Sequence, residues 1–247
     1  MTSVFLAWQD AVTTRAWYPI GRLDADASAD HYVFGYTRGA KRAETEAGFH
    51  PLESFPDFGR RYESAELFPL FRNRVLSSNR EDFADYLRLL DLRPDQADPL
   101  TLLTLTEGRR QTDNLEVFPN INRAPDGAFH CRFFLHGWRH VNEIARQRLD
   151  ALNADDLLRV AVELNNPVTG LAVQLQTEDY HMIGWTPRYL VTDLVRVIAQ
   201  TPGIQARIAK KNALDAPAHQ RFLIDLRGNW PDKYKPMSGD DFLLVNP

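Results

Sequence analysis

Two short stretches indicate the fold of the second half of the chain. The first is Glu163-Leu-Asn-Asn-Pro-Val-Thr-Gly-Leu-Ala-Val173, and the second is Ile183-Gly-Trp-Thr-Pro-Arg188. Asn and Pro favour turns, because Asn tolerates turn conformations of the backbone and Pro fixes its own φ angle. The order of residue types therefore predicts a strand, an Asn-Asn-Pro turn, a second strand and a Gly-aromatic-x-Pro-basic corner.

The sequence around these stretches predicts a mostly antiparallel β structure with two helices. Helical spacing of apolar residues marks 140–152 and 189–199 as the helices. Short apolar or alternating runs predict strands, and they occupy residues 129–138, 157–164, 171–177, 180–185, 204–210 and 221–226.

The first half mixes strands and helices. Strands are expected at 4–8, 17–20, 31–36 and 115–119, and a polar loop is expected from Thr37 to Gly48. Helices are expected to begin near Ser64 and Asn79, and a third apolar run follows Asp98-Pro99. The turn chemistry of Pro125-Asp-Gly127 marks a linker. We therefore expect a first domain over 1–119, a linker over 120–128 and a second domain over 129–247.

Composition limits the classes of function. The 247 residues carry a formal net charge of −4, which argues against a generally basic nucleic-acid coat protein. Residues 1–130 have 15 basic and 20 acidic side chains, against 14 and 13 in residues 131–247. Nucleic-acid binding would therefore need a local patch. The single cysteine, Cys131, excludes an internal disulfide, and no run approaches the roughly 20 apolar residues of a membrane span. Since no signal peptide is evident either, we expect a cytoplasmic protein without a membrane partner.

The second half resembles the HIRAN domain family. Phe133-Phe-Leu-His-Gly-Trp-Arg-His140 is similar to the first HIRAN strand, and the two stretches quoted above are similar to the family's Asn-Pro turn and Gly-x-x-Pro-basic corner. The resemblance covers about residues 130–200. It implies an α+β fold with a compact, OB-related β-barrel and two helices, to which this chain adds a C-terminal β extension. It also implies binding of DNA ends or single strands.

The resemblance assigns positions to a nucleic-acid site. Arg139 and His140 are expected to receive the terminal base and backbone, Asn165 and Asn166 to line the turn, and Arg188 to meet a phosphate. Aromatic faces stack on unpaired bases, and guanidinium groups match phosphate geometry. Trp185 is a candidate surface for base stacking. Alternatively, its side chain belongs to the core of the barrel. From their spacing alone, Lys210 and Lys211 are expected to add to a basic stripe with Arg207 and Arg221, or else to belong to an ordinary charged strand face.

The turn departs from the family pattern at two positions. Val168 stands where the family has a base-stacking Tyr, and Thr169 where it has the Asp that accepts a hydrogen bond from the DNA 3′-hydroxyl. A valine has no π face, and a threonine hydroxyl is an uncharged acceptor. These departures favour an alternative function, a protein-interaction or regulatory module that has lost DNA binding.

The first half is similar to the N-terminal subdomain of HipA-type kinases. The motifs are Gly21-Arg-Leu23, Tyr32 to Tyr36, Pro51-Leu52 and Phe68 to Arg74. The sequence has no Gly-rich nucleotide loop and no His-x-Asp catalytic loop of the kind that kinases use. This strand-and-helix domain is therefore expected to dock a protein partner without phosphotransfer chemistry.

No catalytic constellation, metal site or cofactor site is expected. His136 and His140 have the spacing of zinc ligands on a helix, but a strand end is expected there, so the two rings need not converge. We therefore expect a non-catalytic nucleic-acid-binding module for single-stranded or end-containing DNA, in a bacterial defence or toxin–antitoxin setting. The protein-interaction module is the alternative.

Overall fold

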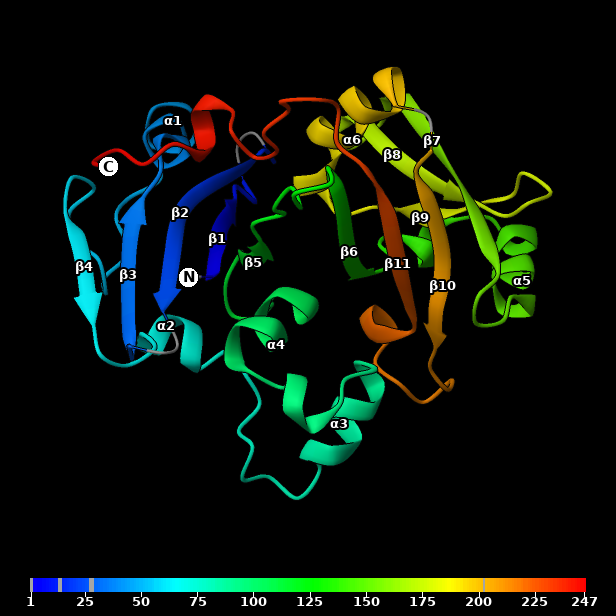
Figure 1. The fold of residues 1–247 in the computed structure, drawn as a ribbon, viewed down its shortest axis with the longest axis horizontal. Coiled ribbons are helices and arrows are strands. Elements are labelled where there is room, and N and C mark those ends of the chain that lie inside the picture. The colour runs from blue at the N-terminus through cyan, green and yellow to red at the C-terminus, as the bar shows by residue number, and fades with distance from the viewer. Residues whose placement is uncertain (1, 13–14, 27–28, 202) are drawn as a thin grey trace. The chain divides into compact units, whose positions relative to one another are not determined.

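The computed structural model describes residues 2–12, 15–26, 29–201 and 203–247. The chain forms two compact units, each built on an antiparallel sheet with helices (Figure 1), so the mixed α+β class is confirmed. The first unit contains residues 1–84, 94–120 and 237–247, and the second contains 85–93 and 121–236. The expected division near residue 120 differs at two segments. It assigned residues 85–93 to the first domain and residues 237–247 to the second, whereas in the structure 85–93 belong to the second unit and 237–247 to the first.

The first unit contains a five-stranded sheet in the order β4-β3-β2-β1-β5. Its strands are β1 (Thr2–Gln9), β2 (Trp17–Asp26), β3 (His31–Tyr36), β4 (Arg61–Ser64) and β5 (Leu115–Pro119). Aromatic side chains from the sheet and the loops after it make the core. The rings of Phe34 and Phe55 stack with centroids 4.0 Å apart, and Tyr36 donates its hydroxyl to the carbonyl of Phe55 at 2.8 Å.

The polar segment after β3 is a helix, so the expectation of a loop from Thr37 to Gly48 was wrong. Helix α1 (Arg38–Ala47) buries a narrow strip of small residues that includes Ala40 and Ala43, and Gly48 ends it at a φ of +67°. Ion pairs join Lys41 to Glu44 and Arg42 to Glu46 on the solvent side. Alanines spaced three residues apart and charge pairs spaced three or four residues apart are signals of a helix. The high polarity of the segment as a whole hides these signals in the sequence.

The segment after Ser64 is much less helical than its apolar spacing predicts. Ser64 ends strand β4, and only α2 (Pro69–Arg72) is helical in this region. Its aromatic residues fill the core instead, with the Phe68 ring edge-on to Phe55 at 5.1 Å. Further along the chain come α3 (Phe83–Leu89), the 3-10 turn η1 (Pro94–Gln96) and α4 (Pro99–Thr106).

The C-terminal segment belongs to the first unit. The amide of Arg38 donates to the carbonyl of Leu243 at 2.8 Å, and the amide of Val245 donates to the carbonyl of Tyr36 at 2.9 Å. Asp241, in the 3-10 turn η4 (Asp240–Phe242), receives both Nε and Nη2 of Arg42, at 3.0 and 2.7 Å. These contacts attach residues 237–247 to β3 and α1 and explain why this end of the chain leaves the second unit.

The second unit contains a six-stranded antiparallel sheet in the order β6-β11-β10-β7-β8-β9. Its elements follow the predicted strands and helices closely. The strands are β6 (Ala128–Phe134), β7 (Leu157–Asn166), β8 (Gly170–Gln176), β9 (Met182–Trp185), β10 (Gln205–Lys211) and β11 (Phe222–Asn229), and the helices are α5 (Glu143–Ala151) and α6 (Arg188–Gln200), with 3-10 turns η2 (Trp138–His140) and η3 (Ala218–Gln220).

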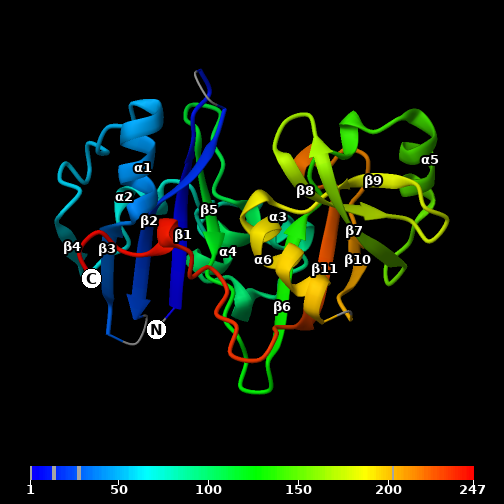
Figure 2. The same cartoon turned by 90° about the horizontal axis from the view of Figure 1, so that it is seen from above.

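This sheet is strongly curved, because β7, β8 and β9 run across the direction of β6, β11 and β10 (Figures 1 and 2). Its two ends meet only at an isolated bridge between His136, just after β6, and Trp185 in β9. No full strand pair joins β6 to β9 in the described part of the chain, so the expectation of a closed OB-like barrel was wrong. The core inside the curve is apolar and includes Phe133, Val173 and Leu194.

None of the helices in the described ranges has both the length and the apolar character that a bilayer crossing requires.

The start of α4 offers a test of local stability. Asp98 accepts the amides of Leu100 and Thr101 at 3.0 and 3.1 Å, and Pro99 occupies the first helical turn, where its missing N–H costs nothing. We expect Asp98→Ala to lower the free energy of unfolding by about 1 kcal/mol, as loss of an N-cap does. Asp98→Asn keeps an acceptor and should stay close to the wild type in urea denaturation. Equal losses in both variants would contradict the capping role.

Candidate nucleic-acid interface

The two ends of the curved sheet meet at a corner formed by β9 and the chain after β6. The amide of His136 donates to the carbonyl of Trp185 at 3.1 Å, and the amide of Trp185 donates back at 2.9 Å. Gly137 follows with a φ of +67°, and a Cβ atom there would lie 2.4 Å from a ring carbon of Trp185. The indole therefore lies directly against the Gly137 backbone, and only glycine provides both the space and the conformation.

The turn η2 next to this indole exposes two basic side chains. Trp138 points inward, donating its Nε1 to the carbonyl of Ala218 at 3.0 Å with its ring edge-on to Phe222. Arg139 and His140 are exposed. Their side chains form no hydrogen bond or ion pair within the described part of the chain, so both are available to a ligand.

A carboxylate that the sequence did not indicate organises the other side of the corner. Oε2 of Glu163 accepts Nε1 of Trp185 at 2.5 Å and Nδ2 of Asn166 at 3.1 Å. Oδ1 of Asn166 accepts the amides of Val168 and Thr169 at 3.0 and 3.1 Å and so holds the turn between β7 and β8. No sequence signal identifies Glu163, because the indole that it holds comes from β9, 22 residues further along the chain.

We use the name Trp185 corner for Gly137, Arg139, His140, Glu163, Asn166 and Trp185. Four predicted residues belong to it, namely Arg139, His140, Asn166 and Trp185. Trp185 is half-buried, Asn165 is exposed at the end of β7, and Arg188 is half-buried at the first position of α6. The corner thus places one indole, two exposed basic side chains and one carboxylate together from three separate segments of the chain, 137–140, 163–166 and 185.

Lys210 and Lys211 do not join the corner. Nζ of Lys211 donates to the carbonyls of Asp150 and Leu152, at 2.7 and 2.9 Å, at the C-terminal end of α5. Nζ of Lys210 donates to the carbonyl of Arg88 in α3. Both ammonium groups satisfy carbonyls that a helix end leaves without an intrahelical partner. The expected basic stripe is divided further, because Arg221 is buried and pairs with Asp150.

A second polar cluster lies on the outer face of β6, β11 and β10. The Asp225 carboxylate accepts Nε of Arg227 at 2.7 Å, Nη2 of Arg227 at 3.0 Å and Nε2 of His130 at 3.0 Å. Arg207 lies on the neighbouring strand, with Nη2 3.7 Å from Asp225. Burial favours the neutral form of Asp225, but the hydrogen bonds from Arg227 and His130 outweigh burial, so the pKa of Asp225 lies below its ordinary value.

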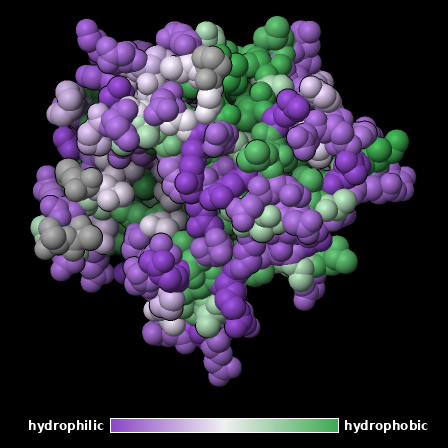
Figure 3. Space-filling view, turned by 45° about the vertical axis from the view of Figure 1, so that its right-hand side comes forward, coloured by the Kyte–Doolittle hydropathy of each residue, from purple (hydrophilic) through white to green (hydrophobic). Residues whose placement is uncertain are grey.

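Hydrophobic side chains are scattered over the surface of the second unit. Hydrophilic residues cover much of the face drawn in Figure 3, with separate hydrophobic groups near its edges. Leu164 and Val168, close to the turn between β7 and β8, are 72% and 64% exposed.

The described ranges hold no group of three or more His, Cys, Asp or Glu side chains placed to bind a metal ion.

Comparison with known proteins gives limited likenesses. No family model and no curated protein matches the chain. A crystal structure of a Lactobacillus plantarum protein from the Northeast Structural Genomics Consortium matches with 16% identity and a TM-score of 0.32, over 41% of this chain and 96% of that one. The crystal structure of the HIRAN domain of human HLTF matches with 15% identity and a TM-score of 0.30, over 42% of this chain and 78% of that one. Neither likeness is close enough to assign a family, and the HipA-like resemblance of the first half stays a prediction.

Gly137 and Gly170 make a matched pair for testing the Trp185 corner. Both have a positive φ, +67° and +70°, but an added Cβ would strike the Trp185 ring only at position 137 and would meet nothing within 4 Å at position 170. Both alanine variants carry the cost of the left-handed backbone, roughly 1–2 kcal/mol. We expect Gly137→Ala to lose a further 1–3 kcal/mol, roughly, from overpacking, measured by urea denaturation. Equal losses would show that the indole does not need this glycine.

Asp225 should make stability depend on pH. Its pKa in the folded protein is below the ordinary value of 3.8, so the ionised carboxylate stabilises the folded state above that value. This stabilisation is lost as pH falls through the folded pKa. We therefore expect Asp225→Asn to lower the free energy of unfolding at pH 7, and the gap from wild type to narrow below about pH 4. A difference in unfolding free energy between variant and wild type that stays constant down to roughly pH 2 would contradict the charge-dependent role. Asp215→Asn, at an exposed position, serves as the control.

Proposed function

We propose that the second unit binds single-stranded nucleic acid at the Trp185 corner and performs no catalysis. The observation that supports the proposal most directly is the packing of Trp185 on Gly137. This packing places an indole next to the turn that exposes Arg139 and His140. An aromatic surface and basic side chains without internal partners are the two features that sequence-tolerant binding of single strands requires.

Each group has a separate physical task. The guanidinium of Arg139 has five N–H donors in a planar fork that fits a phosphate. The imidazole of His140 offers a second donor or a ring face, and the Trp185 indole offers a stacking surface. Stacking of a base on an aromatic side chain contributes about 1–3 kcal/mol. With so few cations, the salt dependence of binding should be shallow.

Glu163 gives the corner a preference for groups that donate hydrogen bonds. Its Oε2 already accepts two bonds, from Trp185 and Asn166, which leaves Oε1 for a base amino group or a sugar hydroxyl. The Thr169 hydroxyl donates to Asn166 at 3.1 Å. Because a carboxylate oxygen is a stronger acceptor than a neutral hydroxyl, we assign the acceptor role for a free 3′-hydroxyl to Glu163 rather than to Thr169. This assignment makes a strand end the preferred form of the ligand.

A protein-docking function is the alternative. The exposed side chains of Leu164 and Val168 favour it, because apolar groups at a turn tip are contacts for protein more than for phosphate. The defence or toxin–antitoxin setting, the cytoplasmic location and the docking role of the first unit stay predictions from the sequence.

Fluorescence anisotropy of labelled oligonucleotides tests the proposed function. We expect the wild type to bind a single strand with a 3′-hydroxyl more tightly than the same strand with a 3′-phosphate, and both more tightly than duplex. Arg139→Gln should weaken binding about tenfold, the equivalent of one charge-assisted contact of about 1.4 kcal/mol. It should also reduce the slope of log K against log salt by about 0.7. Glu163→Gln should reduce the preference for the 3′-hydroxyl, because the amide oxygen is a weaker acceptor.

The charge control is Arg80→Gln, which removes one exposed cation from the first unit and should leave affinity and salt slope unchanged. An Arg139→Gln variant with wild-type affinity and slope would disprove the phosphate role. Equal affinity for strands with a 3′-hydroxyl and a 3′-phosphate would disprove the acceptor role of Glu163. It would leave the phosphate-binding role of Arg139 unaffected. Absence of binding to all three oligonucleotides would favour the protein-docking module.

A further inference from the structure

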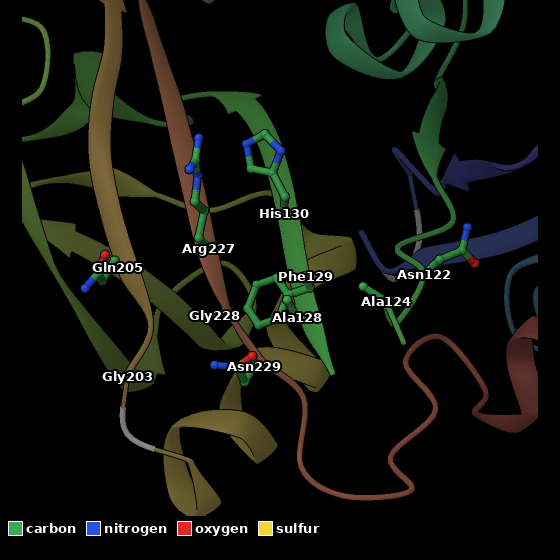
Figure 4. A pocket seen from close by; sticks show the side chains of 10 residues that line it. All are labelled: Asn122, Ala124, Ala128, Phe129, His130, Gly203, Gln205, Arg227, Gly228 and Asn229. Atoms are coloured by element: carbon green, nitrogen blue, oxygen red, sulfur yellow. The ribbon is translucent and has the colours of Figure 1, made fainter. Parts of the chain in front are cut away.

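A groove of about 590 Å³ lies at one end of the outer sheet face, where β6, β11 and the start of β10 meet the chain before β6 (Figure 4). We use the name Asp225 groove for it, because Asp225 holds the two basic side chains that line it. Figure 4 shows the His130 ring beside the Arg227 side chain on neighbouring strands. Side-chain amides supply the remaining polar lining, and they come from Asn122, Gln205 and Asn229.

Arg227 has one occupied and one unoccupied edge. Asp225 engages its Nε and Nη2, which uses two of the five N–H donors of a guanidinium. The edge formed by Nη1 and the second hydrogen of Nη2 has no internal partner in the described structure. The Arg227 side chain is 56% exposed, whereas that of Asp225 is only 7% exposed. A nearly buried carboxylate therefore holds a guanidinium in place with its outer edge free, as bidentate anion binding requires.

His130 is held by the same carboxylate. Its Nε2 lies 3.0 Å from Asp225, which favours the form with a proton on Nε2 and leaves Nδ1 for a ligand. In that form Nδ1 accepts a hydrogen bond, and when the ring is protonated Nδ1 donates one. Half of the side chain is exposed to solvent. The groove thus presents a fixed double donor next to a group that can pair with either a P–OH or a P–O⁻ oxygen.

We propose that the Asp225 groove binds a phosphate monoester carried by an organic group of about nucleoside size. A monoester keeps an ionisable P–OH with a pKa near 6, so its oxygens match both the Arg227 edge and Nδ1 of His130. A volume of about 590 Å³ exceeds what a phosphate needs and falls in the range of small-molecule sites. The amides of Gln205 and Asn229 are suited to the hydroxyls or base edge of the attached group.

The groove and the Trp185 corner have no residue in common. The groove is built on β6, β11 and β10, whereas the corner is built on η2, β9 and the turn between β7 and β8. The proposal therefore does not depend on the proposed function. A phosphate monoester reaches such a site either as a free mononucleotide or as the 5′-phosphate of a nucleic-acid strand, and the experiment separates these two sources.

Titration of the ¹⁵N-labelled full chain, followed by NMR, tests the proposal. The probes are adenosine 5′-monophosphate, adenosine, inorganic phosphate, and one oligonucleotide with and without a 5′-phosphate. We expect adenosine 5′-monophosphate to shift the Arg227 Nε signal and the backbone amides of Gln205 and Asn229, and adenosine to have at least tenfold weaker affinity. If only the phosphorylated oligonucleotide shifts these signals, the strand end is the source, and the proposal stands.

Arg227→Gln should weaken binding of the phosphate ligand at least tenfold, while Arg146→Gln, on the exposed side of α5, should not change it. Loss of Arg227 also removes a partner of Asp225, so a second variant is needed. Asn229→Ala leaves the Asp225 hydrogen bonds in place. It should weaken binding of adenosine 5′-monophosphate more than binding of inorganic phosphate. A cooperative unfolding transition in each variant confirms folding. Equal affinities for adenosine and its monophosphate, unchanged binding by Arg227→Gln in a folded protein, or no shift from any phosphate probe would overturn the proposal.

Discussion

The packing of the Trp185 indole on the bare backbone of Gly137 is the constraint on which the second unit depends. Six strands could form a flat sheet, but the paired hydrogen bonds between His136 and Trp185 bring its first and last strands together. A side chain at position 137 would overlap the indole and force it to shift. The contact between the two ends of the sheet and the position of the indole beside the exposed Arg139 therefore both favour a glycine at position 137.

Both polar sites of the second unit use the same arrangement, in which one carboxylate positions other side chains. Glu163 holds Trp185 and Asn166 at the corner, and Asp225 holds Arg227 and His130 in the groove. Both carboxylates fix geometry, and Asp225 does so at the cost of cancelling the positive charge of Arg227. This arrangement agrees with a chain whose net charge is −4. It favours ligands recognised by shape and hydrogen bonds over ligands attracted by a broad basic surface.

Sequence patterns predicted the strands and helices of the second unit well, because its strands are short apolar or alternating runs and its two longer helices have clear apolar faces. They failed where burial was small or came from distant residues. Helix α1 is held by a strip of small residues, and the C-terminal segment is held by Arg38, Arg42 and Tyr36 of the first unit. Neither type of contact leaves a periodic hydrophobic signal.

The sequence by itself determined most strands and both longer helices of the second unit and where its turns occur, and the resemblance to the HIRAN family named Arg139, His140, Asn166 and Trp185 as candidates for one site. Local preferences are sufficient for the strands, helices and turns, since backbone conformation and apolar periodicity depend on near neighbours. Only the tertiary structure decided that Lys210 and Lys211 bind helix ends, that Glu163 completes the corner, and that Asp225 holds both Arg227 and His130. Apart from the pair of Asp225 and Arg227, these contacts join residues that are more than 20 positions apart in sequence, and their free energy depends on distances that only the folded chain sets.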